Sequence, residues 1–273
     1  MIVNIEKYPI DTKKDASGYE KLLQSSISQL TVQGFVALPD FLRPCAIDKL
    51  TSCILDLERR GVGFYSCDSH NVFLEEEGDS ASFQSPTNHP RNVLLNSSKL
   101  IIDARHLAPH FVELTDLYES REFINFVGSI LGTELHPSAD PHGRYYANVF
   151  RPGDGLQWHL DRSEYSVSLI LRPAHVGGKF QFVPNSRRVV EGWDDMPSDV
   201  IHAFAHEASM VVEEPDLVAG DMYIFRGRDS LHRVSEIAEG TRINLILTYN
   251  ADPGVRLNRY TLRKFFGVAD PTP

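Results

Sequence analysis

The sequence of 273 residues contains little cysteine and no long hydrophobic run. Cys45, Cys53 and Cys67 form no CxxC pair and no regular framework, which disfavours a disulfide scaffold and favours free thiols in a reducing compartment. No stretch approaches the roughly 18 consecutive apolar residues of a membrane-spanning helix. The opening MIVNIEKYPIDTKK has no basic segment followed by an apolar one, so no signal peptide is expected. We therefore expect a cytoplasmic protein without a membrane partner.

Positive charge is also scarce, since 27 Lys and Arg residues face 37 Asp and Glu residues and give a net charge of −10. Binding to DNA or RNA calls for a basic surface, so the acidic balance argues against a nucleic-acid partner. The expected partner is a small molecule, and the overall field favours a cationic one. The glycines of GVGFYS and HVGGKF form no phosphate-binding loop signature. The sequence leaves monomer and homodimer open.

The apolar residues of the first 140 residues recur mainly at helical spacing. This spacing predicts amphipathic helices over 16–33, 44–60 and 110–131. The segment GFVALPDFL, at 34–42, predicts a short strand. Residues 66–92 are rich in Ser, Asp, Glu, Asn and Pro and predict a long loop, for which we favour a lid or substrate-side role.

From Arg144 onward, short apolar runs alternate with turn signals, which indicates an antiparallel sandwich or barrel. The runs that predict strands are RYYANVF (144–150), VSLILRP (167–173), KFQFVP (179–184), DMYIFRG (221–227), HRVS (232–235) and RINLILTYN (242–250). The sequence shows no internal repeat and no flexible linker. We expect one α+β domain over 1–273, with helical support and the lid loop in 1–140, a jelly-roll core in 141–255 and a tail in 256–273.

The strongest feature is the pair His159 and Asp161 in LQWHLDRSEYS. Residues two apart on an extended strand point to the same side, so an imidazole and a carboxylate are presented together. The natural third ligand is His232, which opens a short strand directly after a turn in GRDSLHRVS. Two histidines and one carboxylate on one face leave open coordination positions, an arrangement that suits non-haem iron(II) oxygenases.

Arg242, at the start of the strand in GTRINLILTYN, adds a candidate anion anchor. A guanidinium can hold a carboxylate through two parallel hydrogen bonds, as the far carboxylate of an iron-chelating 2-oxoglutarate requires. An HxD pair by itself occurs by chance in chains of this length, and a single strand histidine is more often a structural core residue. The ordered set of His159, Asp161, His232 and Arg242 inside a β-rich half is much harder to obtain by chance.

A second histidine pair, His202 and His206, has the spacing that binds zinc on a helix. It lacks the glutamate of the HExxH motif, and its surroundings do not predict a long helix. A structural role is therefore the better interpretation of this pair.

At these residues the sequence resembles the iron(II)/2-oxoglutarate oxygenase superfamily, which has a double-stranded β-helix core. Over 145–254, the segments NVFRPGDGLQWHLDRSEYSVSLILRPAHVGGKFQFVP, GDMYIFRGRDSLHRVS and RINLILTYNADPG are more closely similar to the carrier-independent amino-acid halogenases and their hydroxylase relatives. The resemblance implies that His159, Asp161 and His232 bind iron(II) and that Arg242 binds 2-oxoglutarate. It also implies O₂ as a cosubstrate, with ascorbate as a candidate reductant.

One position separates two chemistries in that family. Halogenases carry Gly or Ala at the carboxylate position, which opens a site for chloride, whereas this sequence carries Asp161. The resemblance therefore implies hydroxylation of an unactivated C–H bond in a free amino acid or similar small polar molecule, with decarboxylation of 2-oxoglutarate to succinate and CO₂. Desaturation, epoxidation or cyclisation of a natural-product intermediate stays open, as does a non-catalytic jelly-roll binding module.

The candidate substrate contacts lie around these motifs. Alternation along YYANVF puts Tyr146 and Asn148 on one face, which we expect to line the pocket. Arg162 follows the HxD pair, and Arg228 lies in FRGRDSLH. Both arginines are candidate contacts for the charged ends of an amino acid, although a solvated surface role or a turn-stabilising role explains them equally well.

Overall fold

The computed structural model describes residues 2–10, 16–74, 89–162, 165–190, 193–196, 200–201, 204 and 211–268. Its centre is an eight-stranded sheet in which all the pairings are antiparallel. The sheet runs in the order β1 (Phe35–Leu38), β12 (Met222–Phe225), β7 (Tyr165–Arg172), β15 (Arg242–Asn250), β5 (Tyr145–Phe150), β3 (Leu95–Asp103) and β2 (Phe64–His70), and β4 (His136–Pro137) also pairs with β15.

A smaller sheet faces the main one, since residues from both line one cavity. It consists of β6 (Leu156–His159), β13 (Leu231–Val234) and β9 (Phe180–Val183), in that order. Two further pairs of short strands are β8 (Val176–Gly177) with β14 (Ile237–Glu239), and β10 (Arg188–Val190) with β11 (Trp193–Asp195). The expected combination of helices with a large antiparallel β structure is therefore confirmed.

The main sheet is apolar on one face and mixed on the other. In β15, every second residue from Ile243 to Tyr249 belongs to the largest hydrophobic core, whereas Asn244 and Ile246 line the cavity. The neighbouring β5 alternates in the same way, with Ala147 on the core side. A strand presents successive side chains to opposite faces, so this alternation separates the core from the functional cavity.

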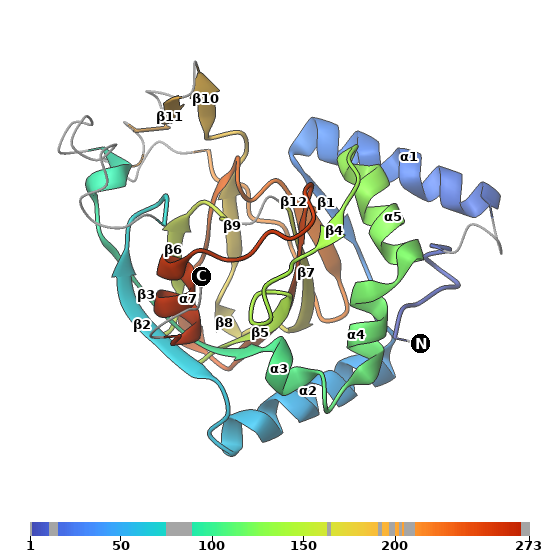
Figure 1. Ribbon diagram of the computed structural model, residues 1–273, viewed down its shortest axis with the longest axis horizontal. Helices are drawn as coiled ribbons and strands as arrows, with labels where there is room; N and C mark the ends of the chain where they lie inside the picture. Colours follow the sequence, from blue (N-terminus) through green and yellow to red (C-terminus); the bar gives the residue numbers. More distant parts are fainter. Residues whose placement is uncertain are drawn as a thin grey trace.

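The helices α1 (Ala16–Gln33), α2 (Pro44–Arg59), α4 (Val112–Glu119) and α5 (Arg121–Leu131) contribute to that core. Figure 1 shows them together along one side of the molecule. The first two confirm the predicted helices closely. The helix predicted over 110–131 is two helices, because Ser120 adopts an extended backbone and its hydroxyl accepts a hydrogen bond from the Phe123 N–H, which caps α5. Within the described residues, none of the helices is long and apolar enough to cross a membrane.

The first 140 residues also supply strands β1, β2 and β3 to the main sheet, so the expected helical half is only partly helical and the division at residue 140 does not follow the sheet. Between β3 and α4 lies the short helix α3 (Ala104–Leu107). The loop predicted over 66–92 begins inside β2 and ends in the 3₁₀ turn Pro90–Asn92. Residues 75–88, where a lid was expected, lie outside the described residues.

The segment 256–273, expected to be a C-terminal tail, contains the helix α7 (Arg259–Phe266). Asn258 caps its first turn by accepting a hydrogen bond from the Thr261 N–H at 2.8 Å. The ring of Phe266 packs edge-on against Tyr146, with 5.3 Å between the ring centroids. In Figure 1, α7 lies beside β2 and β3, away from the other helices. The helix therefore forms part of the wall behind the cavity.

Candidate functional site

Three metal-ligating side chains meet on the inner side of the smaller sheet. His159 ends β6, and His232 pairs with it across the antiparallel β6–β13 ladder. The Nε2 atoms of His232 and His159 lie 3.4 Å and 3.8 Å from Oδ1 of Asp161. One donor atom from each of the three side chains lies within 4.8 Å of the others, and no other such group of His, Cys, Asp or Glu occurs in the part of the chain that is described.

The two imidazoles are oriented by the backbone. Nδ1 of His159 lies 2.8 Å from the Gln157 carbonyl oxygen, and Nδ1 of His232 lies 2.8 Å from the Ser230 carbonyl oxygen. A carbonyl oxygen can only accept, so each Nδ1 carries the proton and each Nε2 keeps its lone pair. This tautomer directs both Nε2 atoms toward Asp161, as hydrogen-bonded histidine ligands do in metal sites.

The electrostatics of the cluster favour a neutral His159 imidazole and an ionised Asp161 carboxylate. Burial, and then the charge of His232, lower the pKa of His159 well below its usual range. Burial alone would raise the pKa of Asp161, but the two imidazoles and the Lys99 ammonium hold it below its usual value. Both directions match the protonation states that a metal ligand needs.

The Asp161 carboxylate is positioned by a turn. Asp161 lies beyond the end of β6, and its backbone N–H donates to the Gly227 carbonyl oxygen at 2.9 Å. A Cβ atom on Gly227 would lie 2.1 Å from Oδ2 of Asp161 and 2.9 Å from its Cγ. The carboxylate therefore occupies the space that a side chain at 227 would take.

A cavity lies between the two sheets next to this cluster. Tyr146 and Asn148 both line it, as the alternation along their strand predicted. Other lining residues are Lys99, Ser166, Ser168, Tyr223 and Asn244 from the main sheet, and Phe180 from the smaller sheet.

Arg242 begins β15 and lies behind the lining of this cavity. Its side chain is buried, with Nε donating to the Gly178 carbonyl oxygen at 2.9 Å and Nη1 donating to Oδ1 of Asn244 at 2.6 Å. Burial lowers the pKa of Arg242, and the adjacent Tyr223 hydroxyl opposes that change. Arg242 lines an adjoining cavity that shares Phe180 with the first. Arg242 is connected to the first cavity through its neighbours Asn244 and Tyr223, which line that cavity.

The family is decided by the model of Halogenase D, which matches residues 81–261. The chain belongs to the halogenase D family. No curated protein sequence matches this chain. The superfamily predicted from the HxD, His and Arg motifs includes this family, so the resemblance is confirmed at the level of the family.

Solved structures of 2-oxoglutarate oxygenases share the fold of this halogenase D family member. The carbocyclase SnoK from nogalamycin biosynthesis has a TM-score of 0.58 at 16% identity, with 93% of this chain and 95% of that chain covered. A 2OG-Fe(II) oxygenase family oxidoreductase from Burkholderia pseudomallei has a TM-score of 0.53 at 15% identity, covering 86% and 93%. HygX from Streptomyces hygroscopicus, solved with nickel, 2-oxoglutarate and hygromycin B, has a TM-score of 0.53 at 12% identity, covering 86% and 90%. The chain thus shares its fold with 2-oxoglutarate oxygenases.

Two of the predicted substrate contacts are not in the cavity of this halogenase D family member. Arg162 and Arg228 are exposed, and neither is among the residues that line it. The backbone oxygen of Arg228 instead accepts a hydrogen bond from Nη1 of Arg187 at 2.9 Å. Both residues lie outside the strands, in the segments next to Asp161 and Gly227. His202 and His206, the alternative metal pair, lie outside the described residues.

Two buried residues near the cluster were missed by the sequence analysis. Lys99 of β3 lines the cavity and is 6% exposed. His70 of β2 is buried, with Nε2 hydrogen-bonded to Oγ of Ser97 at 2.6 Å and its ring 6.1 Å from that of His159. Both lie on strands that the sequence did not predict. The available signal was the short apolar run Leu100–Ile102 at the end of β3.

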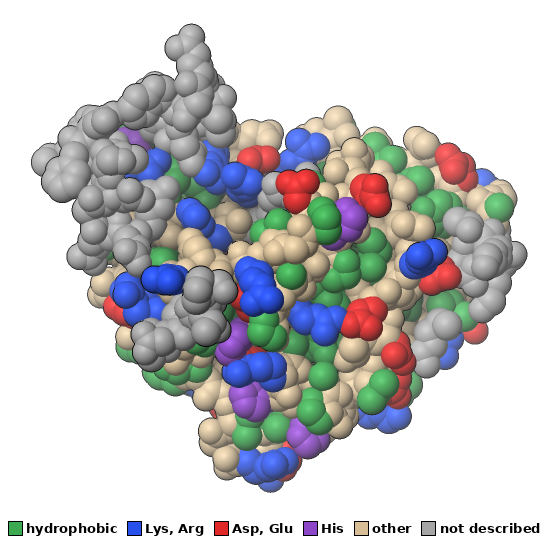
Figure 2. Space-filling model, in the orientation of Figure 1, with side chains coloured by type: hydrophobic (Ala, Val, Ile, Leu, Met, Phe, Trp, Pro, Cys, Tyr) green, Lys and Arg blue, Asp and Glu red, His purple; other side chains and the backbone are tan. Residues whose placement is uncertain are grey.

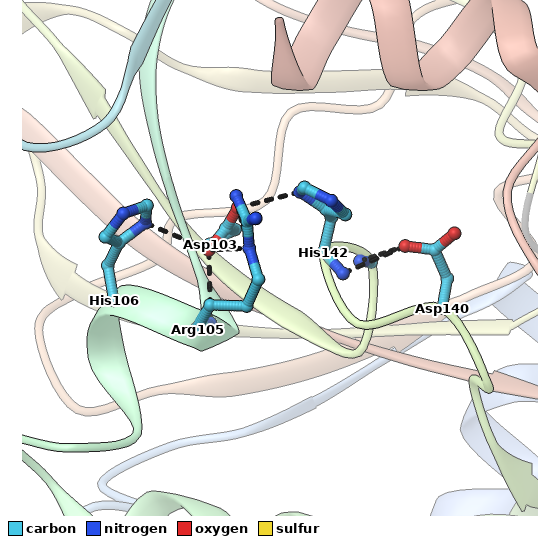
Figure 3. A network of polar contacts seen from close by, with 6 residues as sticks. Asp103, Arg105, His106, Asp140 and His142 are labelled. Carbon is cyan, nitrogen blue, oxygen red and sulfur yellow. Dashed lines mark hydrogen bonds and ion pairs between the residues drawn. The ribbon is translucent and has the colours of Figure 1, made fainter. Parts of the chain in front are cut away.

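A second cluster of titratable groups lies at the far end of β3 (Figure 3). The Asp103 carboxylate accepts hydrogen bonds from Nη2 of Arg105 at 2.7 Å and from Nδ1 of His106 and of His142 at 3.0 Å. Asp140 caps the turn of His142 by accepting from its backbone N–H at 2.9 Å. The cluster connects β3 to the turn before β5 through the contact of Asp103 with His142. Since the Arg105 guanidinium already pairs with the carboxylate, the cluster offers no cation site.

Proposed function

We propose that this member of the halogenase D family is an iron(II)- and 2-oxoglutarate-dependent hydroxylase that acts on a free amino acid or similar small polar molecule. The observation that carries the proposal is the Asp161 carboxylate, which completes a ligand set with His159 and His232. The halogenases that this sequence resembles carry Gly or Ala at this position, so the carboxylate distinguishes the chain from them. Gly227 gives that carboxylate its space.

The donor set suits iron(II). Two imidazole nitrogens and one carboxylate oxygen on one side of an ion leave the other positions open, which is the ligand arrangement of non-haem iron oxygenases. Both Nε2 atoms carry lone pairs, because both Nδ1 atoms donate to carbonyl oxygens. Iron bound here would supply O₂ activation coupled to the oxidation of 2-oxoglutarate to succinate and CO₂. The protein's own residues orient the ligands and keep the site buried.

The surroundings of Arg242 support a 2-oxoglutarate anchor. Two of the five guanidinium N–H donors are used by Gly178 and Asn244, which leaves donors for a carboxylate. The Ser168 hydroxyl is buried without a well-formed hydrogen bond and lies opposite Tyr223 in the β7–β12 ladder. A carboxylate placed there would accept from Ser168 and from Arg242 together. Arg242 and Ser168 are thus assigned to the far carboxylate of 2-oxoglutarate.

A second candidate keeps the cofactors and changes the outcome to cyclisation, desaturation or epoxidation of a natural product. It is favoured by the fold likeness to SnoK, a carbocyclase, and to the epimerase SnoN, whose structure has a TM-score of 0.58 at 12% identity. The match covers 85% of this chain and 81% of SnoN. The position of the substrate relative to the metal decides between these outcomes in such sites.

The test is a succinate-release assay with iron(II), 2-oxoglutarate, ascorbate and a panel of free amino acids. We expect one amino acid to stimulate succinate release and to gain one oxygen atom by mass spectrometry. Asp161→Ala should reduce hydroxylation by at least 100-fold in the same assay, since loss of one ligand typically weakens metal function by this order or more. Wild-type hydroxylation by Asp161→Ala would contradict the ligand assignment. Succinate release only with larger natural products would favour the second candidate.

A further inference from the structure

Lys99 is a buried cation that faces the metal cluster across the cavity. It lies in β3, is 6% exposed, and lines the same cavity as His159, Asp161 and His232. Among the described residues it forms no hydrogen bond and no ion pair. Its ammonium nitrogen instead lies 5.3 Å from the ring centroid of Phe265 in α7. The protein therefore holds a charged group in the cavity that no side chain of the described residues pairs with directly, although the Asp161 carboxylate lines the same cavity.

This arrangement is costly unless a ligand compensates it. An unpaired ammonium loses its hydration on burial. Burial lowers the pKa of Lys99 to about 8, which the negative charge of Asp161 opposes and the positive charge of Arg242 reinforces. The side chain thus still carries its proton at neutral pH. A strongly perturbed group lining a cavity is a typical feature of a ligand-binding site.

The charges of the loaded cavity leave one positive charge unmatched. Lys99, Arg242 and a divalent metal face one carboxylate, that of Asp161, which leaves three formal positive charges. A 2-oxoglutarate dianion cancels two of them. A hydroxy acid, which is a monoanion, cancels the remaining charge, whereas an amino acid offers a carboxylate to Lys99 and brings its own ammonium group.

Lys99 and Arg242 lie on opposite sides of Phe150. Arg242 pairs with Phe150 in the β15–β5 ladder, and Leu100 pairs with Val149 in the β3–β5 ladder, so Lys99 stands beside Phe150 on the other side. Two strand spacings, about 10 Å in all, separate the two backbones. The two cations are therefore placed to bind two different carboxylates, one from the cosubstrate and one from the substrate.

Asn148 supplies a second unmatched group next to Lys99. Its Oδ1 atom is buried and has no hydrogen-bond partner among the described residues. Asn148 pairs with Ile101 in the β3–β5 ladder, two residues from Lys99 along β3, and both side chains line the cavity. Oδ1 is an acceptor, so it needs an N–H or O–H donor. A carboxylate with an amino or hydroxyl group close to it would satisfy both residues.

We propose that Lys99 binds the carboxylate of the substrate and Asn148 accepts from a neighbouring amino or hydroxyl group, so that the substrate is an amino acid or hydroxy acid with an unblocked carboxylate. This assignment rests on the proposed oxygenase function. Lys99 is a binding residue here, distinct from the metal ligands and from the Arg242 site. The rival role for Lys99, contact with the metal-side carboxylate of 2-oxoglutarate, is an outcome of the same experiment.

The experiment measures ligand binding rather than turnover. The protein is loaded with nickel(II) and 2-oxoglutarate, and the melting temperature is followed with the standard amino acids, their 2-hydroxy analogues, their carboxamides and their decarboxylated amines. We expect at least one acid to stabilise the wild-type protein while its carboxamide and amine do not. In Lys99→Met the dissociation constant for that acid should rise about 10- to 100-fold, as the loss of a charge-assisted hydrogen bond implies. The dissociation constant for 2-oxoglutarate should stay within about twofold of wild type.

Two controls keep the outcomes separate. Lys21→Met removes the same charge from an exposed lysine of α1, and it should leave binding of the acid unchanged. Apo Lys99→Met should melt no lower than wild type, because it loses an unpaired buried charge. Stabilisation by no acid, equal stabilisation by the carboxamide, or unchanged affinity in Lys99→Met overturns the proposal. A weaker 2-oxoglutarate affinity in Lys99→Met assigns Lys99 to the cosubstrate instead. No stabilisation of the wild type by nickel(II) and 2-oxoglutarate would contradict the oxygenase function itself.

Discussion

At the residue scale, the ligand cluster depends on Gly227, which has no side chain to displace the Asp161 carboxylate. Asp161 follows the end of β6, so its strand alone does not fix the direction of the carboxylate. The carboxylate is held by the hydrogen bond from its backbone to Gly227 and by the space above that glycine. The sequence motif predicted the ligands from alternation along a strand. It did not reveal Gly227, because no local pattern connects two turns that are far apart in the chain.

Gly227→Ala should displace the third ligand. The added Cβ would lie 2.1 Å from Oδ2 of Asp161, so the carboxylate must rotate away from the two Nε2 atoms. We expect iron(II) or nickel(II) affinity to fall about 10- to 100-fold in anaerobic calorimetry, as for loss of ligand positioning in metal sites. Arg226→Ala, an exposed change in the same turn, is the matched control and should bind metal like wild type. Equal affinities in Gly227→Ala and wild type would show that the carboxylate is not a ligand.

Arg242→Lys tests the cosubstrate anchor while keeping the positive charge. A lysine cannot reproduce the two parallel hydrogen bonds of a guanidinium, so the KM for 2-oxoglutarate should rise about 10- to 100-fold. Metal affinity should stay at the wild-type value, since Arg242 does not contact the three ligands. Arg172→Lys, at an exposed position on the adjacent strand β7, is the control. An unchanged KM in Arg242→Lys would move the anchor to another residue.

At the element scale, strands with an apolar face were predictable and strands that face the cavity with polar groups were not. In the second half, runs such as RINLILTYN kept enough apolar residues to be recognised even though Arg242 and Asn244 interrupt them. Strand β3, with the sequence LNSSKLIID, has Ser97 and Lys99 buried inside the protein. Its polar first half has the composition of a loop, so the sequence did not predict a strand there. Sequence rules fail at such places because a polar binding cavity needs residues that break the usual pattern. The α7 helix was missed because it has only eight residues, three of which are the cationic Arg259, Arg263 and Lys264.

The Asp103 cluster connects the end of β3 to the turn before β5, and it makes a pH-dependent contribution to stability. Burial alone raises the pKa of Asp103, but Arg105, His106 and His142 outweigh that effect and lower it. A lowered pKa in the folded state means that the ionised carboxylate stabilises the fold above the ordinary Asp value of 3.8 and that this contribution is lost as the pH falls through the lower folded value.

Asp103→Asn should therefore destabilise the protein by roughly 1–3 kcal/mol near pH 7, since hydrogen bonds to a charged group are lost. The difference from wild type should shrink as the pH falls below the ordinary Asp range. Melting temperatures from about pH 3 to pH 8 would measure it. Asp116→Asn, an exposed change on α4, should show no such pH-dependent difference. A difference that stays constant over the whole pH range would mean that ionisation of Asp103 does not stabilise the fold.

At the scale of the whole molecule, net charge and cavity charge have opposite signs. The chain carries a net charge of −10, from which a cationic partner was expected. The cavity nevertheless holds Lys99 and is backed by Arg242, and Figure 2 shows Lys and Arg side chains gathered on part of the face that it presents. Composition adds all charges equally, whereas a buried charge acts with little screening on a ligand beside it. The expectation of a cationic partner therefore does not extend to the cavity.

Metal binding should stabilise the whole fold, because the three ligands come from segments that are brought together only in the folded chain. A ligand that binds the folded state alone stabilises it by about 2.7 kcal/mol at a concentration of 100 times its dissociation constant. We expect nickel(II) to raise the melting temperature of the wild type and EDTA to reverse the rise. His232→Gln should lose most of the shift, since Gln removes the Nε2 donor that faces Asp161. The paired change His202→Gln and His206→Gln should keep all of it, and its loss there instead would assign the metal to the other histidine pair.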